Sequence, residues 1–512
     1  MQRTFYLTTP IYYVNDVPHI GHAYTTIACD ALARYRRMKG CGVFFLTGTD
    51  EHGLKVEKAA AEAGEKPIEL ADRVVERFRG LWKKLLITNT DFIRTTEPRH
   101  QDGVREFFKK VEASGDVYLG SYEDWYCVPC ENFLTETQLV NGACPDCGRP
   151  VEKLKEESYF FRLSNYTEPL LKFYADNPDF IKPESRYNEI VSFVKEGLRD
   201  LSISRTTFSW GIPIPGNDRH IFYVWFDALL NYVTATGFFA GADTAAFWPA
   251  DVHVIGKDIL RFHAVYWPAF LMSAGLPLPK KVFAHGWWTI EGKKMSKSMG
   301  NAVDPYALSD QYGVDQLRYF LLREVPFGLD GDYSRHAIVG RINADLANDF
   351  GNLASRTISM VHKYFDGEVL EGEPGGPAEA RLKEKAQAVL AAVDGHMNDL
   401  AFNRALTSIW ELVSMVNKYI DESAPWALAK DPAQRGRLAA VMRACADALK
   451  TCALLTAPFM PLAAQALWEA LGEQGEVAGQ QLEAAAARGV APGTRLKKIA
   501  ALFPRIQTDA KA

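Results

Sequence analysis

A strand followed by a proline-marked helix start, near the N-terminus, constrains the fold more than any other part of the sequence. The run Thr4–Thr9 is typical of a strand, and apolar residues recur at helical spacing from Ile20 until Gly40 ends the pattern. Pro18 marks the boundary, because its backbone torsion suits a helix edge and it has no N–H to donate. The apolar run Val43–Thr47 predicts a parallel strand covered on both faces, so the chain opens as a β-α-β unit.

Two histidines lie in the first turn of the predicted helix. His19 and His22 are three residues apart and share a face, where unpaired backbone N–H groups and the helix dipole favour an anion. Gly21 between them has no side chain, which lets a nucleotide lie close against the backbone. Taken alone, the pair is more typical of solvated or helix-capping histidines.

A second cationic segment, Lys294-Met295-Ser296-Lys297-Ser298, follows the predicted strand Val282–His285. Lysine suits phosphate oxygens, and the flanking glycines predict a mobile loop that closes over a bound substrate. Alone, a basic pentapeptide is typical of solvated surface. The combination of this segment with the histidine pair is what indicates a nucleotide site.

Whole-chain quantities exclude few classes. The 512 residues predict roughly three domains. Apolar residues make up 47% and charged residues 24%, as in soluble globular proteins, and the net charge of −5 means that any nucleic-acid surface must be local. The first residues contain no secretory signal, and Pro458 and Pro461 interrupt the most apolar window, so we expect a cytoplasmic enzyme without a membrane span.

Eight cysteines fall into two groups. Four of them form two Cys-x-x-Cys turns with 13 residues between the turns, and these are Cys127, Cys130, Cys144 and Cys147. Two such turns predict a closed tetrahedral zinc site, which has no open ligand position and is therefore structural. The alternative is reduced thiols without a metal. The remaining four are predicted to be small packing residues, namely Cys29, Cys41, Cys445 and Cys452.

The rest of the chain divides into α/β and helical parts. Helical patterns are predicted at 54–86 and 98–114, and strands at 223–226, 252–255 and 282–285. Carboxylates follow the second strand, where Asp50 or Glu51 can hold an ammonium group. Beyond Asp304 the chain is nearly all helical; long helices are expected at about 336–364, 378–396, 401–422 and 434–471, with loops after Gly472.

His-Ile-Gly-His after the first strand and Lys-Met-Ser-Lys-Ser after the last resemble the two signatures of class I aminoacyl-tRNA synthetases. Over essentially its whole length the chain resembles the methionyl-tRNA synthetase family, in the bacterial form with one four-cysteine knuckle and no C-terminal RNA-binding domain. The carrying segments, besides the cysteines, include 10–15, 47–53, 223–228, 256–259 and 424–426. The resemblance implies attack on the α-phosphate of ATP, with His19, His22, Lys294 and Lys297 as catalytic residues.

The resemblance also assigns the remaining site residues. The implied ATP-binding residues are the two histidines together with Gly21, Lys294, Ser296 and Lys297. Lys294 and Lys297 would neutralise pyrophosphate, and Mg²⁺ would accompany ATP. The implied methionine pocket consists of Ile11, Tyr13, Asp50, Trp225, Leu229, Tyr232, Ile259 and His263. Aromatic and aliphatic walls suit an unbranched thioether. The implied anticodon contacts are Asn352, Arg356 and Trp426, residue types that stack on or read unpaired bases; alternatively, Trp426 is a core residue.

The expected fold is α/β, a Rossmann-like parallel sheet interrupted by a zinc-knuckle insertion and followed by an all-α helical bundle. We expect five segments: the first half of the catalytic domain (1–117), the inserted domain (118–219), the second half of the catalytic domain (220–290), the lysine loop with linking helices (291–345), and the anticodon-binding bundle with its tail (346–512). The expected partners are methionine, ATP and both elongator and initiator tRNA(Met), and the expected state is a monomer.

Two alternatives stay open at this point. A cysteine-specific synthetase uses zinc to bind the substrate thiol, but here four cysteines fill every ligand place. A catalytically silent RNA-binding relative has no need of His19, His22, Lys294 and Lys297. Relatives specific for isoleucine, valine or leucine carry a long hydrolytic insertion, whereas the insert here spans roughly 100 residues and is centred on the cysteines.

Overall fold

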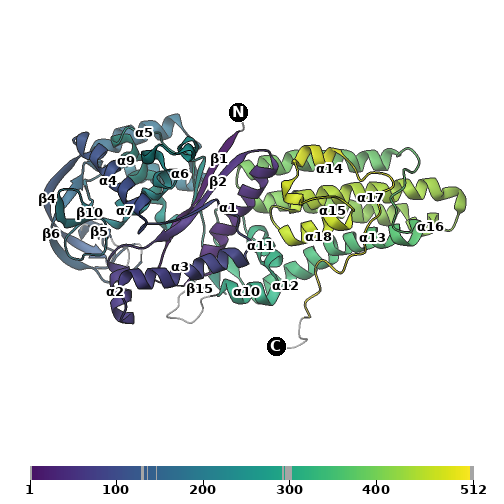
Figure 1. Ribbon diagram of the computed structural model, residues 1–512, viewed down its shortest axis with the longest axis horizontal. Helices are drawn as coiled ribbons and strands as arrows, with labels where there is room; N and C mark the ends of the chain where they lie inside the picture. Colours follow the sequence, from purple (N-terminus) through teal and green to yellow (C-terminus); the bar gives the residue numbers. More distant parts are fainter. Residues whose placement is uncertain are drawn as a thin grey trace.

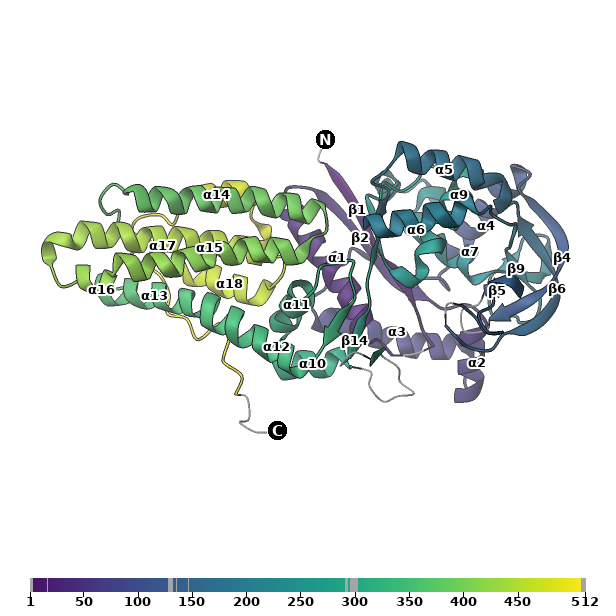
Figure 2. The same ribbon diagram turned by 180° about the vertical axis from the view of Figure 1, so that it is seen from behind.

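The structure is a computed structural model in which an α/β part and a helical part lie end to end (Figure 1). It describes residues 3–15, 17–127, 132–134, 136–145, 147–290, 293–294 and 303–507, without the side chains at 122–124, 132–133, 137, 154–156 and 293–294. Helix α1 (Ile20–Met38) lies between the two parts, as the view from behind also shows (Figure 2).

Six parallel strands form the central sheet, in the order β3-β2-β1-β12-β13-β7. They are β1 (Thr4–Tyr13), β2 (Gly42–Asp50), β3 (Asp91–Arg94), β7 (Ile181–Lys182), β12 (Val252–Gly256) and β13 (Val282–His285). From β1 the chain adds β2 and then β3 on one side of the sheet. The later strands β12 and β13 are added on the other side of β1. The carboxyl ends of β1 and β12 therefore flank the switch point at which ligands bind in sheets of this kind.

Helices cover both faces of this sheet. They are α1, α3 (Pro67–Lys84), α4 (Pro98–Ala113) and α9 (Trp267–Ser273), while α2 (Leu54–Ala63) packs against α3. The helix predicted at 54–86 is thus two helices, because Gly64 ends α2 in the left-handed region at φ 71°. Tyr6 and Leu7, adjacent on β1, belong to different buried clusters, so the sheet has a core on each face.

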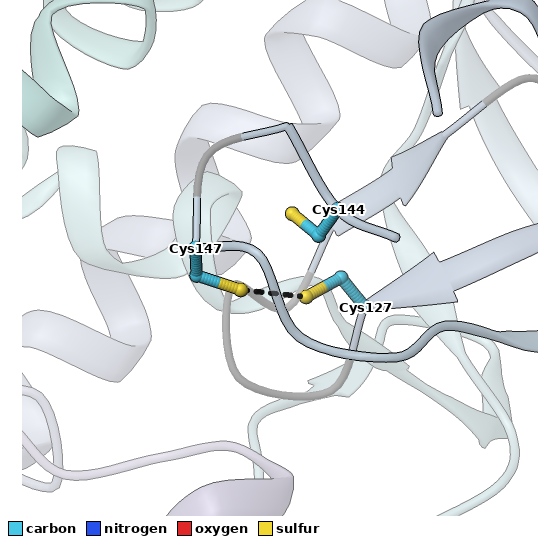
Figure 3. A group of neighbouring side chains, drawn as sticks. All are labelled: Cys127, Cys144 and Cys147. Carbon is cyan, nitrogen blue, oxygen red and sulfur yellow. Dashed lines mark hydrogen bonds between the residues drawn. The ribbon is translucent and has the colours of Figure 1, made fainter. Parts of the chain in front are cut away.

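The inserted region is mostly antiparallel. Its four-stranded sheet has the order β5-β4-β6-β8 and is built from β4 (Val117–Cys127), β5 (Asn132–Leu134), β6 (Glu152–Phe161) and β8 (Leu201–Ser202). Three cysteines point toward one another beside β4 (Figure 3). Helices α5 (Thr167–Asp176) and α6 (Glu184–Lys195) follow, and β7 between them joins the edge of the central sheet beside β13.

The strand predicted at Tyr223–Phe226 is wrong. A three-stranded sheet in the order β10-β11-β9 precedes this segment, made of β9 (Ser204–Arg205), β10 (Pro213–Ile214) and β11 (Asn217–Phe222). The chain then turns at Tyr223 into α7 (Val224–Leu229) and α8 (Asn231–Thr234). Aromatic residues favour strands locally, but here burial of Phe226 within the core decides the conformation.

A small sheet and two helices connect the two parts of the molecule. The sheet has the order β15-β14-β16 and consists of β14 (Trp288–Ile290), β15 (Lys293–Lys294) and β16 (Gly331–Tyr333). Helix α10 (Pro305–Tyr312) begins the helical part expected beyond Asp304, and the Asp304 side chain accepts from the backbone N–H of Tyr306. Helix α11 (Val314–Arg323) follows it.

The C-terminal part is a bundle of long helices. They are α12 (Arg335–Arg341), which runs on through residues 342–351 into α13 (Asn352–Phe365), then α14 (Pro377–Asn398), α15 (Phe402–Ser423) with the short α16 (Pro425–Leu428), α17 (Arg435–Thr456), α18 (Pro461–Ala470) and α19 (Leu482–Ala487). The prediction of a single helix at 434–471 is wrong. Pro458 and Pro461, which have no N–H to donate, separate α17 from α18. The region after Gly472 also contains a helix, α19. No described helix has the length and apolarity needed to cross a membrane.

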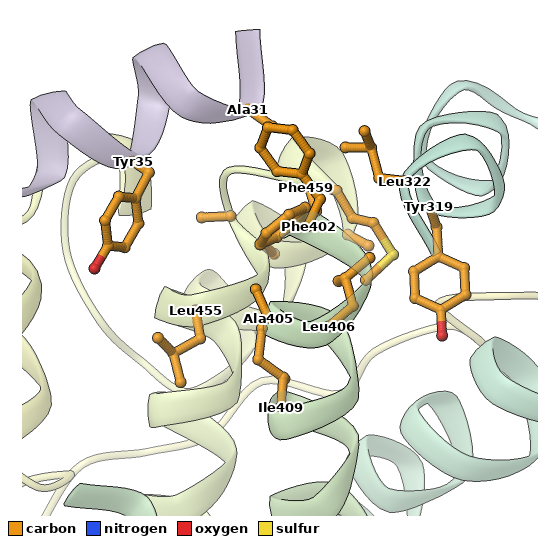
Figure 4. Packing of buried hydrophobic residues seen from close by; sticks show 14 of the residues in the cluster. Ala31, Tyr35, Tyr319, Leu322, Phe402, Ala405, Leu406, Ile409, Leu455 and Phe459 are labelled. Atoms are coloured by element: carbon orange, nitrogen blue, oxygen red, sulfur yellow. The ribbon is translucent and has the colours of Figure 1, made fainter. Parts of the chain in front are cut away.

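One continuous core joins the sheet to the bundle. The buried cluster on the α1 side of the sheet extends through α11 into α15 and α17. Figure 4 shows Ala31 and Tyr35 of α1, Leu322 of α11 and Phe402 of α15 facing this shared interior. The bundle is therefore packed directly against the helix that begins with His19 and His22.

Candidate active site

His19 and His22 cap the start of α1 with their own side chains. The Nδ1 atom of His19 accepts from the backbone N–H of Gly21 at 3.1 Å, and the Nδ1 atom of His22 accepts from the backbone N–H of His19 at 3.2 Å. The two rings stack with their centroids 3.8 Å apart. Because each Nδ1 is an acceptor, the proton of each neutral ring is on Nε2, which is a donor. The capping interpretation of these histidines is thus compatible with a chemical role.

Glycine at position 21 is explained by the histidine next to it. A Cβ atom there would lie 2.9 Å from Cε1 of His19, closer than carbon atoms approach without a shift of the ring. The rings of Tyr12 and Phe78 lie 4.7 Å and 5.4 Å from that of His22 and hold it from the sheet side and from α3. The absence of a side chain therefore preserves the histidine stack.

The eight residues that are predicted to form the methionine pocket lie at the carboxyl edge of the central sheet. Tyr13 and Asp50 are direct neighbours across β1 and β2. The others come from β1 and from the segments that follow β11 and β12. The set is Ile11 and Tyr13 on β1, Asp50 at the end of β2, Trp225 and Leu229 on α7, Tyr232 on α8, and Ile259 and His263 after β12.

Apolar walls enclose this edge. Leu229 and Tyr232 are buried members of the core on that face, and four partly buried residues pack against the same core, namely Ile11, Tyr13, Trp225 and Ile259. The rings of Trp225 and Phe262 stack in parallel with centroids 3.8 Å apart. The arrangement brings residues that are 252 positions apart in the chain (263 − 11) into one lining.

Two hydrogen bonds fix the His263 ring. Its Nδ1 lies 2.9 Å from the carbonyl oxygen of Ile259, which can only accept, so Nδ1 carries the proton. Its Nε2 lies 2.7 Å from the hydroxyl of Tyr232, which therefore donates. Burial lowers the pKa of His263 to about 4. The ring is neutral near pH 7 and adds no charge to the pocket.

Of the two acidic residues that could hold an ammonium group, Glu51 already accepts hydrogen bonds from three neighbouring side chains. Its carboxylate accepts from Nε of Arg94 at 2.6 Å and from the hydroxyl of Thr49 at 2.7 Å, and the Thr96 hydroxyl also donates to it. Asp50 precedes it at the end of β2 and is 3% exposed. Glu51 is therefore the less suitable of the two carboxylates for an ammonium group.

A buried carboxylate between two histidines was not predicted as part of the site. Asp227, two residues after Trp225, accepts from Nδ1 of His52 at 2.6 Å and from Nε2 of His100 at 2.7 Å. Burial alone would raise the pKa of Asp227, but the two histidines outweigh it and lower the pKa to about 2. The trio ties α7 to the end of β2 and to α4. No spacing in the sequence relates these positions.

The strand that carries Lys294 lies close to α1. Lys294 pairs with Thr289 across β15 and β14, and Ser296 and Lys297 lie outside the described residues. On β14, the Trp288 ring lies 5.5 Å from that of Tyr24 on α1. The chain leading into the lysine segment thus runs beside the first turns of the histidine helix.

Three of the four predicted zinc ligands form a cluster, and Cys130 lies outside the described residues. The sulfurs of Cys127, Cys144 and Cys147 all lie within 4.8 Å of one another, with 3.5 Å between those of Cys127 and Cys147 (Figure 3). Tetrahedral zinc with Zn–S bonds of about 2.3 Å separates its sulfurs by about 3.8 Å. A disulfide needs about 2.05 Å. The donor set fits a metal ion.

The predicted anticodon residues lie on the bundle. Asn352 and Arg356 are one turn apart on α13, where Asn352 is exposed and Arg356 donates to Asp421 of α15 at 2.6 Å. Trp426 follows on α16 and is 45% exposed, so the alternative of a core tryptophan is wrong. Because α15 leads directly into α16, the contact with Asp421 brings the three positions to neighbouring elements.

Family models account for nearly all of the chain. The one described as "tRNA synthetases class I (M)" matches residues 5–153 and 150–358, more than half of the sequence. The one described as "Anticodon binding domain of methionyl tRNA ligase" matches residues 369–512. The chain belongs to the methionyl-tRNA synthetase family. The first match covers the α/β part and continues through α12 into α13, and the second covers the bundle from residue 369 onward.

Curated relatives agree over the full length. A methionine–tRNA ligase of Caldanaerobacter subterraneus is 52% identical over 511 residues, which cover 99% of this chain and 80% of the relative. One of Bacillus subtilis is 49% identical over 524 residues, 99% of this chain and 78% of the relative. The prediction of a class I ligase that joins methionine to tRNA is confirmed.

Solved methionyl-tRNA synthetases share the fold. The Mycobacterium tuberculosis enzyme in complex with methionyl-adenylate superposes with a TM-score of 0.95 at 48% identity, covering 98% of this chain and 100% of that one. Its apo form has a TM-score of 0.89 at 44% identity and covers 99% of each chain. The predicted fold class, a Rossmann-like sheet with a cysteine-knuckle insertion and a helical bundle, is confirmed.

Proposed function

We propose that His19 and His22 stabilise the transition state in which methionine attacks the α-phosphate of ATP. A carboxylate oxygen of methionine bonds to the α-phosphorus while the bond to the bridging oxygen of pyrophosphate breaks. Negative charge then accumulates on the phosphoryl oxygens, where fixed donors are worth several kcal/mol. The observation that carries this proposal is the pair of Nδ1 acceptor bonds, which makes Nε2 of both rings a donor.

The lysine segment would complete the phosphate site. Lys294 and Lys297, with Ser296, would neutralise the departing pyrophosphate, and Gly21 would lie beneath the nucleotide. The position of β15 near the first turns of α1 supports this assignment for Lys294. Mg²⁺ would enter bound to the triphosphate and would balance its charge. The methionyl group then passes to the 2′-hydroxyl of the terminal adenosine of tRNA.

Methionine would occupy the pocket at the sheet edge. Asp50 would hold its ammonium group, and the apolar walls would contact the thioether chain, whose polarizable sulfur suits aromatic neighbours. The neutral His263 and the Tyr232 hydroxyl bonded to it would lie nearest the sulfur. A pocket of this kind discriminates poorly against homocysteine, because one methylene is worth about 1–3 kcal/mol.

The cysteine cluster would hold one zinc ion. Cys127, Cys144 and Cys147 would act together with Cys130 as four thiolate ligands, which leaves no position for water or substrate. The ion would stabilise the inserted domain, where the described cysteines share their small core with Leu134. It would take no part in the reaction.

The bundle would recognise tRNA(Met), both elongator and initiator. Exposed Trp426 would stack on an unpaired anticodon base, while Asn352 and Arg356 would read base edges. The five segment boundaries (1–117, 118–219, 220–290, 291–345 and 346–512), the monomeric state and the cytoplasmic location stay predictions from the sequence.

The proposed role of His22 is tested with two substitutions that separate capping from donation. In His22→Asn the amide occupies the place of Nδ1, so it keeps the cap and loses the distal donor; His22→Gln reaches the place of Nε2 and loses the cap. Single-turnover adenylate formation should fall about 10²–10³-fold in His22→Asn, with methionine affinity unchanged, and by much less in His22→Gln. A larger loss in His22→Gln than in His22→Asn would mean that capping is the main role of His22.

A further inference from the structure

A basic hollow lies on the bundle, away from the active site, between α13 and the tail of the chain. Its volume is about 400 Å³. We call it the α13–tail hollow. It is lined by Ser355, Ile358, Ser359, His362, Lys363, Lys498 and Ile499.

The lining has the chemistry of an anion site. Lys363 and Lys498 are positively charged, and among the described residues that line the hollow none is acidic. Two serine hydroxyls can donate or accept, and the two isoleucines add apolar surface to the lining. Lysine and hydroxyl donors of this kind bind phosphate oxygens. Since the whole chain carries a charge of −5, this local positive charge is not a reflection of overall composition.

His362 adds a polar ring nitrogen that the fold leaves unsatisfied. Its Nε2 atom is buried and has no hydrogen-bond partner among the described residues. The ring lies close to Gly367, where a Cβ atom would come within 2.7 Å of Cε1 of His362. Buried polar groups without partners are rare in proteins, and one at the wall of a hollow indicates a ligand.

The hollow lies beside the predicted anticodon residues. Asn352, Arg356, Ser359 and Lys363 follow one another at helical spacing and share one face of α13. Arg356 marks the flank toward α15, and the hollow occupies the flank toward the tail. Lys363 is about 11 Å along the helix axis from Arg356, at 1.5 Å per residue.

We propose that the α13–tail hollow binds a backbone phosphate of the tRNA anticodon arm, next to the bases that Asn352, Arg356 and Trp426 are proposed to read. This inference rests on the proposed function of the bundle. Phosphate contacts fix the register of a nucleic acid on a protein while other residues read its bases. The hollow would thereby set which nucleotides reach α13.

The first test replaces both lysines, as Lys363→Ala with Lys498→Ala. A matched control is Lys383→Ala, which changes an exposed lysine of α14. In both views α14 lies on the side of the bundle away from α13 (Figures 1 and 2). For an anticodon stem-loop RNA, the double variant should raise Kd about tenfold and reduce the slope of log Kd against log salt by about 0.7 for each phosphate that the lysines no longer neutralise. The control should change neither the Kd nor the slope.

The second test uses stem-loops that carry a single neutral methylphosphonate linkage, scanned along the backbone. One linkage near the anticodon should weaken binding to the wild-type chain and have no further effect on the double variant. A scan in which every linkage affects both proteins equally would overturn the proposal, as would a control that weakens binding as much as the double variant.

Methionine-dependent pyrophosphate exchange, measured beside stem-loop binding, distinguishes a failure of the proposed phosphate site from a failure of the proposed tRNA-binding function of the bundle. Unchanged exchange and wild-type stem-loop binding, together with an unaffected double variant, would refute the hollow alone. A wild-type chain that does not bind the stem-loop at all would refute the proposed function of the bundle.

Discussion

Single residues at the end of β2 show how neighbouring carboxylates come to differ. Glu51 is fully buried and bonded to Arg94, whereas Asp50 ends β2 at the edge where the pocket residues gather. The sequence allowed either residue to hold an ammonium group. Only the three-dimensional position of Arg94, on the neighbouring strand β3, distinguishes them.

The pair predicts opposite phenotypes. Asp50→Asn should raise the KM for methionine at least tenfold while leaving the free energy of unfolding within about 1 kcal/mol. Glu51→Gln should lower the free energy of unfolding by about 3 kcal/mol, because it breaks a buried ion pair. Urea unfolding and pyrophosphate exchange measure the two effects, and a Glu51→Gln variant of normal stability would contradict the assignment.

The buried neutral His263 predicts a dependence of stability on pH. Its pKa falls from an ordinary value near 6.5 to about 4 on folding, so the unfolded state binds the proton more tightly. The contribution of His263 to the free energy of unfolding is therefore fully present above pH 6.5 and is lost as the pH falls toward 4. As the pH falls from 7 to 5, the protonation of this residue in the unfolded state should lower the free energy of unfolding by about 2 kcal/mol.

Denaturant unfolding at pH 7, 6 and 5 measures this effect. The His263→Gln variant should lose less stability over that range than the wild-type chain, since glutamine does not titrate. Identical slopes for the two proteins would show that His263 keeps its ordinary pKa.

Residue-level prediction from sequence failed where partners are remote. His52, His100 and Asp227 form one hydrogen-bonded trio, yet no periodicity or motif relates the three positions. The signature histidines and the cysteine turns, in contrast, carry their chemistry in local spacing, which is visible in one sequence.

Helices and strands were predicted well where a single pattern dominates. The β1-α1-β2 unit and helices α14 and α15 follow from periodicity, because each buries one clear face. The errors have identifiable causes. Tyr223–Phe226 is β-favouring in composition but helical in context, and α17 stops before two prolines that lie within an otherwise apolar helical pattern.

At the junction of elements, one arginine connects three segments. Arg318 of α11 is completely buried and donates to Asp30 of α1 at 2.7 Å, to the carbonyl oxygen of Phe459 at 2.9 Å and to that of Leu85 at 3.1 Å. It thus ties the histidine helix to the turn between α17 and α18. This contact joins the α/β part to the bundle.

Replacing this arginine should loosen the junction. Arg318→Met should lower the free energy of unfolding by about 3–5 kcal/mol, because it removes one partner of a buried ion pair together with the bonds to the carbonyl oxygens of Phe459 and Leu85. The double variant with Asp30→Asn should recover part of that loss. A double variant no more stable than Arg318→Met would show that the carbonyl bonds, not the ion pair, carry the effect.

On the scale of the whole molecule, two proposed activities belong to two ends of one packed chain. Methionine would be activated at the sheet edge, and the bundle would recognise tRNA. The continuous core from β1 through α1 and α11 to α15 joins the two ends. The order of these parts was predictable because each has its own periodicity, but the way α1 packs against the bundle was not, since it depends on contacts between distant helices.

The most direct measurement compares pyrophosphate exchange with tRNA charging in the Trp426→Ala variant. Loss of one stacked base is worth about 1–3 kcal/mol, so kcat/KM for tRNA charging should fall roughly 5- to 150-fold. Methionine-dependent exchange should stay within about twofold of the wild-type value, because Trp426 lies on the bundle with 45% of its surface exposed. A parallel fall in exchange would contradict the division of the enzyme into an activating part and a recognising part.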